Sequence, residues 1–147
     1  MTGSGSAEPR VGGIDHVLLS IPRGGEDRAR AFYGGVLGLR EVPKPPPLDT
    51  HGGCWFTAPG VDIHVGVEEP FRPARKAHVA LVVEDLDGLR AALEAAGAEV
   101  QDDDAPIGVR RFYAFDPFGN RLELVDARDR DFTARHRGAI EAPARRR

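Results

Sequence analysis

Apolar and polar positions follow the same order of patterns twice along the chain. The segment IDHVLL at 14–19 has the alternation of a β-strand and reappears as KAHVAL at 76–81. Each is followed by an apolar stripe at helical spacing, formed by Ala29, Phe32, Tyr33, Val36 and Leu37 in the first half and by Leu86, Leu89, Leu93 and Ala96 in the second. Asp85 is placed to cap the second helix, and Gly38 and Gly97 to end the two helices.

A second pair of similar segments completes each half. FTAPGVDIHV at 56–65 resembles FDPFGNRLEL at 115–124, and Gly60 and Gly119 mark a hairpin in each. Each half therefore reads as strand, helix and three strands. The sequence predicts an α+β fold built from tandem βαβββ modules.

Pro70 and Pro73 interrupt regular structure between the halves, so we expect modules at 14–69 and 75–127 within one domain at 14–127. Residues 1–13 are rich in glycine and serine and are expected to form a flexible tail. Residues 128–147 are expected to form a basic tail.

Composition narrows the class of protein. Hydrophobic residues make up 41% of the chain, yet no apolar run approaches the roughly 18 residues of a membrane span, and no secretory signal precedes the domain. The single cysteine favours a cytoplasmic protein.

The net charge is −7 over residues 1–126 and +4 over 127–147, which argues against nucleic-acid binding by the body of the protein. Frequent Ala, Gly, Arg and Pro are typical of a GC-rich bacterial gene.

Strand alternation predicts which polar side chains share a face. The branched apolar faces, such as Ile63 and Val65, are the natural seats for the helices. The opposite, concave face of the sheet then carries His16, His64, His78 and Glu123. His16 corresponds to His78 in the repeat, and His64 corresponds to Glu123.

Three imidazoles and one carboxylate are a suitable donor set for one divalent metal ion, Zn, Ni, Co, Fe or Mn. The alternative is that each histidine is only a hydrogen-bonded packing residue. His64 has two possible roles, as a ligand or as a nearby acid/base, because imidazole titrates near neutrality. Glu123 and His64 are the candidate catalytic groups.

The tandem pattern, the two His-Val strands and the segment DPFGNRLEL at 116–124 resemble the vicinal oxygen chelate superfamily. This family includes glyoxalase I, extradiol dioxygenases, fosfomycin-resistance enzymes, methylmalonyl-CoA epimerase and bleomycin-resistance proteins. The resemblance covers residues 14–127. It implies modules forming a cup-shaped mixed sheet, with helices on the outer face and one divalent metal inside.

The resemblance also implies residue roles. His16, His78 and Glu123 fall on ligand positions of the family, whereas His64 falls where glyoxalase I has a glutamate. It implies a glyoxalase-like lyase or isomerase that acts on a small oxygenated substrate through a metal-stabilised enolate or oxyanion. The alternatives are an Fe(II) extradiol dioxygenase and a non-catalytic protein that binds a small molecule or antibiotic. It further implies a homodimer whose site is shared between the subunits.

Several residues are candidates for contact with the small-molecule substrate because of their position near these strands: Trp55, Phe71, Arg72, Lys76, Arg111 and Tyr113. Alternation sends one of Arg110 and Arg111 inward, where it could clamp a carboxylate or phosphate. The alternative is a solvated basic rim. We expect Cys54 to be structural, and assign His51, in a glycine-flanked loop, no role.

Overall fold

The two predicted modules are present in the structure, a computed structural model that describes residues 9–104 and 108–130. The elements of the first module are β1 (Val17–Ile21), α1 (Glu26–Ala29), η1 (Arg30–Val36), β2 (Arg40–Val42), η2 (Leu48–Thr50), β3 (Cys54–Ala58) and β4 (Val61–Val67). Those of the second are β5 (His78–Val83), α2 (Leu86–Ala95), β6 (Val100–Asp102), β7 (Arg111–Phe115), β8 (Arg121–Asp126) and η3 (Ala127–Asp129). No described helix is long and apolar enough to cross a membrane.

Each module forms its own four-stranded mixed sheet, and the two sheets have the same topology. The strand order is β1-β4-β3-β2 in one and β5-β8-β7-β6 in the other. The first strand of each module pairs in parallel with the last, and the remaining pairs are antiparallel. The predicted α+β class and tandem repeat are confirmed, and β1 and β5 lie at one edge of their sheets, with β2 and β6 at the other.

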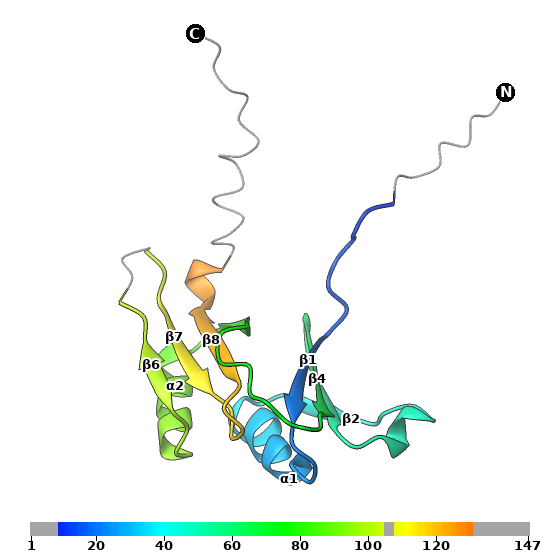
Figure 1. The fold of residues 1–147 in the computed structure, drawn as a ribbon. Coiled ribbons are helices and arrows are strands. Elements are labelled where there is room, and N and C mark those ends of the chain that lie inside the picture. Colours follow the sequence, from blue (N-terminus) through cyan, green and yellow to red (C-terminus); the bar gives the residue numbers. More distant parts are fainter. Residues whose placement is uncertain (1–8, 105–107, 131–147) are drawn as a thin grey trace, which may run out of the picture.

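One hydrophobic core joins the modules. It is formed by the helix-covered faces of both sheets and by helical residues, including Ile63 and Leu122 from the strands and Phe32 and Leu93 from the helices. Figure 1 shows the two sheets side by side, with the helical segment 26–36 at the base between them. The predicted seating of the helices on the branched apolar faces is confirmed.

Buried hydrogen bonds also tie the modules together. Asn120 Nδ2 donates to the Ser20 carbonyl oxygen on β1 at 2.8 Å and to Asp116 Oδ2 at 2.8 Å, and the Tyr33 hydroxyl donates to Asp116 Oδ2 at 2.7 Å. Asn120 Oδ1 accepts from the Ala74 amide at 3.0 Å. The 116–124 segment, which carries Glu123, thus also provides the hydrogen bonds that connect the two modules.

The first helix differs from a regular α-helix. After one α-turn it continues as a π-helix, in which the Leu37 amide donates to the Phe32 carbonyl oxygen at 2.9 Å. Gly34 and Gly35 lie in this segment. Because glycine favours the regular α-helix less than other residues do, the chain can adopt the wider turn here at little cost. The second helix forms as predicted, with the Asp85 carboxylate accepting from the Gly88 amide at 2.9 Å. Most of both predicted tails, 1–8 and 131–147, lies outside the described residues.

Candidate metal centre and substrate cavity

The four predicted donor residues occupy equivalent positions in the two sheets. In the first sheet, His64 pairs with Leu18, two residues after His16. In the second, Glu123 pairs with Ala80, two residues after His78. The repeat seen in the sequence therefore corresponds to the same strand pairing in both sheets. Each module has one donor at the start of its first strand, since His16 directly precedes β1 and His78 opens β5, and one donor on the neighbouring strand.

The second module brings His78 and Glu123 into contact. His78 Nε2 lies 2.9 Å from Glu123 Oε2, and His78 Nδ1 lies 2.9 Å from the Lys76 carbonyl oxygen. A neutral imidazole has one N–H, so it can donate to only one of these two acceptors. A cation between Nε2 and the carboxylate would let Nδ1–H donate to the carbonyl while Nε2 and Oε2 both act as ligands. The pair therefore has the donor chemistry of part of a metal centre.

Arg111 contacts the Glu123 carboxylate from its other side, and Asp103 in turn contacts Arg111. Arg111 Nη1 donates to Glu123 Oε1 at 2.8 Å, and its Nη2 contacts Asp103. The Tyr113 hydroxyl donates to the same Asp103 carboxylate at 3.3 Å. These side chains are mostly buried, with 19% of Arg111 and 10% of Glu123 exposed. Because Arg111 is engaged in this way, it orients Glu123 within this chain.

The first module arranges its donors differently. His16 Nδ1 lies 2.7 Å from the Asp15 carboxylate, which leaves Nε2 directed elsewhere, and 41% of the His16 side chain is exposed. The His64 ring is stacked between two others, with its centroid 4.0 Å from the Trp55 ring and 4.1 Å from the His16 ring. Trp55 is thus in contact with His64.

The stacking bears on the role of His64. A histidine binds a metal through a lone pair in the plane of its ring, at about 2 Å. The His16 and His64 rings are inclined by only 16°, so no ion can lie near both nitrogens and in both planes. Burial, followed by the charge of nearby His16, lowers the pKa of His64. In this arrangement His64 lies beside His16 without sharing an ion with it, and its lowered pKa favours the neutral ring.

A cavity of about 670 Å³ opens beside these rings. Its walls include His16, Leu18, Lys44, His51, Trp55 and His64. Lys44 and His51 were not predicted, because they lie in the loop at 43–53, where alternation gives no guidance about direction. The signal that could have found them is their position between β2 and β3, which border the site.

The two half-sites do not meet within one chain. Among residues 9–104 and 108–130, no three His, Cys, Asp or Glu side chains are close enough together to hold a metal ion. Leu18 on β1 is 56% exposed and Val82 on β5 is 51% exposed, on the same faces as His16 and His78. β1 and β5 therefore each present an uncovered apolar side chain on the face of the neighbouring donor residues.

The remaining candidates lie in the segment that leads into β5. Phe71 packs edge-to-face against Phe118 at 6.3 Å, and Arg72 is exposed in the segment before β5. Lys76 reaches His78 through its carbonyl oxygen. Of the paired arginines, Arg111 is the inward one.

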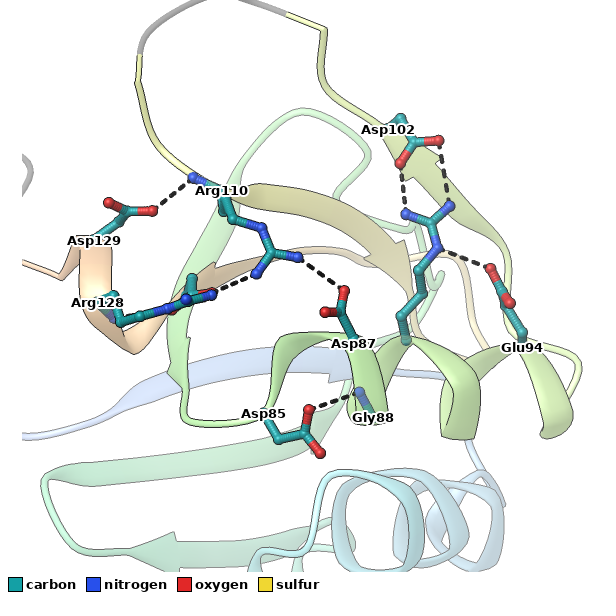
Figure 2. A network of polar contacts seen from close by, with 10 residues as sticks. Asp85, Asp87, Gly88, Glu94, Asp102, Arg110, Arg128 and Asp129 are labelled. Atoms are coloured by element: carbon teal, nitrogen blue, oxygen red, sulfur yellow. Dashed lines mark hydrogen bonds and ion pairs between the residues drawn. The ribbon is translucent and has the colours of Figure 1, made fainter.

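Arg110 is directed away from the donors. Its guanidinium contacts the carboxylates of Asp87 and Asp126 at 2.9 Å each, and Figure 2 shows it reaching toward Asp87 on α2. Cys54 is buried and packs in the core, as expected for a structural cysteine.

Comparisons with known proteins agree with this architecture. The chain is 47% identical to a protein assigned to the glyoxalase family from Bacillus anthracis, with a TM-score of 0.76 over 82% of this chain and 98% of that one. The fold is also similar to the fosfomycin resistance protein FosX from Listeria monocytogenes, at 16% identity and a TM-score of 0.65, covering 80% of this chain and 94% of FosX. A lactoylglutathione lyase from Agrobacterium tumefaciens has 22% identity and a TM-score of 0.61, covering 80% of this chain and 96% of the lyase.

The latter two likenesses concern the fold alone, and none of the curated proteins searched matches the chain. The sequence model of the Glyoxalase/Bleomycin resistance protein/Dioxygenase superfamily matches residues 13–124, which is most of the chain. The chain belongs to this superfamily.

Proposed function

We propose that this chain is a divalent-metal-dependent enzyme, a glyoxalase-like lyase or isomerase that acts on a small oxygenated substrate. The observation that carries the proposal is the placement of His78 between two acceptors, the Lys76 carbonyl oxygen and the Glu123 carboxylate. Family membership and a fold shared with a lactoylglutathione lyase support the same class of activity.

His16, His78 and Glu123 would hold the metal. Both histidines have Nδ1 next to an oxygen acceptor, Asp15 for His16 and Lys76 for His78, so Nε2 is the nitrogen available to an ion. Two imidazoles and one carboxylate leave coordination positions for a substrate. When bound, the ion supplies stabilisation of negative charge that develops on substrate oxygens.

The chain's own residues supply the proton transfer. The stacked His64 is unprotonated at neutral pH because its pKa is lowered, so it can accept a proton from a substrate carbon. Glu123 is the second candidate base. The Trp55 ring, which covers one face of His64, fixes the ring's direction and excludes water from that face.

The complete site would form in a homodimer. β1 of one subunit would lie beside β5 of the other, so that His16 meets His78 and Glu123 across the interface. The exposed Leu18 and Val82 side chains support this arrangement, because pairing the edges would bury apolar surface that is uncovered in one chain. The cytoplasm is the expected location, since the one cysteine is buried and free.

An Fe(II) dioxygenase is the second candidate, because two histidines and one carboxylate also form the ligand set of non-haem iron oxygenases. Metal identity separates the two. Turnover with Ni²⁺, Co²⁺ or Zn²⁺ favours proton transfer, and oxygen uptake that requires Fe²⁺ favours ring cleavage.

Metal titration by calorimetry tests the proposal. We expect the chelator-treated protein to bind one Ni²⁺ or Zn²⁺ ion per chain, and His16→Ala, His78→Ala and Glu123→Gln each to lose at least about 100-fold in affinity. His51→Ala is the matched control, since His51 lines the cavity without belonging to the ligand set. Unchanged metal binding in the three variants, or full activity on a substrate after metal removal, would contradict the proposal.

A further inference from the structure

We propose that Arg121, stacked on Tyr113, forms an anion-binding subsite beside His78 and Glu123 that receives a carboxylate or phosphate group of the substrate. The inference rests on the proposed function, since it adds a determinant of substrate class to the same site. Arg121 was not among the residues singled out from the sequence.

Strand register places Arg121 at the site. It opens β8, pairs with His78 on β5 and lies two residues before Glu123, so alternation puts it on the face of both donors. Its guanidinium carbon lies 3.7 Å from the centre of the Tyr113 ring. The Tyr113 ring therefore supports the flat face of the guanidinium, whose N–H donors point outward in the guanidinium plane.

The hydrogen bonding of Arg121 is incomplete. Its Nε is buried and has no hydrogen-bond partner among the described residues, where no other buried side-chain nitrogen or oxygen lacks one. A buried donor without an acceptor is costly, and such groups in native proteins call for an explanation. Because the Arg121 side chain as a whole is only half-buried, a small shift of its guanidinium toward a bound ligand would give Nε an acceptor.

The neighbouring arginines are already paired with carboxylates. Arg111 contacts Glu123 and Asp103, and Arg110 contacts Asp87 and Asp126. Within the described part of the chain Arg121 makes no such ion pair. Arg121 therefore differs from Arg110 and Arg111 in that no described carboxylate contacts its guanidinium.

The chemistry of the group selects the class of ligand. A guanidinium offers parallel N–H donors that match the paired oxygens of a carboxylate or phosphate. A substrate with such a group near its reacting oxygens would be held by Arg121 while the donors of the site engage those oxygens. A neutral carbonyl oxygen could accept one of these hydrogen bonds, but it would neither match the paired donors nor balance the charge of Arg121.

Calorimetry on the full-length protein tests the subsite, with benzoate and phenylphosphonate as separate probes of the carboxylate and phosphate classes. Titrations without metal isolate the contribution of Arg121, and titrations with Zn²⁺ show whether metal and anion bind together. We expect Arg121→Gln to weaken binding of at least one probe by about tenfold or more, and Arg121→Lys to weaken it less. Arg110→Gln is the matched control, with less than about a twofold change expected.

Binding of both probes within twofold of wild type in Arg121→Gln would overturn the inference, as would a wild-type protein that binds neither probe. An Arg121→Gln variant that loses dimerisation but retains probe binding would also overturn it, because Arg121 would then pair across the subunit interface. If Arg121→Gln does not fold, Arg121→Lys carries the same test. Metal stoichiometry is measured separately, so failure of the metal site and failure of the anion subsite are distinguishable.

Discussion

His78 Nε2 lies 2.9 Å from Glu123 Oε2, with the Lys76 carbonyl oxygen 2.9 Å from the other ring nitrogen. The corresponding residues of the first module, His16 and His64, are instead stacked at 4.1 Å. Equivalent strand positions thus give two different arrangements. The Glu123 carboxylate contacts the edge of the His78 ring, whereas the His64 ring packs on the face of the His16 ring. The donor pair of the second module is the stronger half of the proposed metal centre.

Arg111 should control metal affinity without being a ligand. It donates to Glu123 Oε1 at 2.8 Å and so fixes the direction of the carboxylate. We expect Arg111→Gln to weaken Zn²⁺ binding by about 10- to 100-fold while the stoichiometry stays at one ion per chain. Arg110→Gln serves as the control in the same calorimetric titration. Wild-type affinity in Arg111→Gln would contradict this role.

Asn120 should be important for stability. Its buried side chain connects β1, Asp116 and Ala74 by three hydrogen bonds. We expect Asn120→Ala to lower the free energy of unfolding by about 2 kcal/mol or more, because buried partners lose their bonds. Urea denaturation measures this. Gln101→Ala, which removes an exposed contact to Glu99, should change it by less than about 0.5 kcal/mol.

The lowered pKa of His64 predicts a pH dependence. Burial and His16 favour the neutral ring, so the folded chain binds this proton more weakly than the unfolded chain, whose histidine has a pKa of about 6.5. The resulting stabilisation is complete above about pH 6.5 and declines as the pH falls through the pKa of the folded state. NMR titration of metal-free protein should give His64 a midpoint below 6.5.

The same titration on Trp55→Ala supplies the control, because removing the stacked ring exposes His64 and should raise the midpoint. A wild-type midpoint at or above about 6.5 would contradict the predicted burial effect.

Cys54 should be unreactive in the folded protein. The side chain is 1% exposed, and burial raises its pKa to about 11, so little thiolate forms at neutral pH. We expect negligible reaction with a disulfide reagent under native conditions and complete reaction in concentrated guanidinium chloride. Rapid native labelling would show that the core around β3 opens readily.

Much of the fold was predictable because its signals are local and repeated. Alternation correctly paired His64 with the strand that follows His16, and Glu123 with the strand that His78 opens, and the apolar stripes identified the helices. The π-helical turn at η1 could not be predicted, since its hydrogen-bond shift depends on how Phe32 and Tyr33 pack in the core.

The finer structure of the site was less predictable. Alternation shows which face a side chain occupies but not which partner it meets, so the contacts of Arg111 with Glu123 and of Arg121 with Tyr113 required the structure. Asp103 and Lys44 lie outside the strands, where periodicity carries no information about side-chain direction. The separation of the donors into two half-sites is a property of module packing and has no local sequence signal.

The most direct test of the shared metal site mixes two inactive variants. His16→Ala and Glu123→Gln each destroy every site in their own homodimers. After the variants are mixed and allowed to exchange subunits, each heterodimer regains one intact site. The account predicts that tight metal binding returns to about a quarter of the wild-type stoichiometry in an equal mixture. A mixture that binds no more metal than the separate variants would contradict a site shared between subunits.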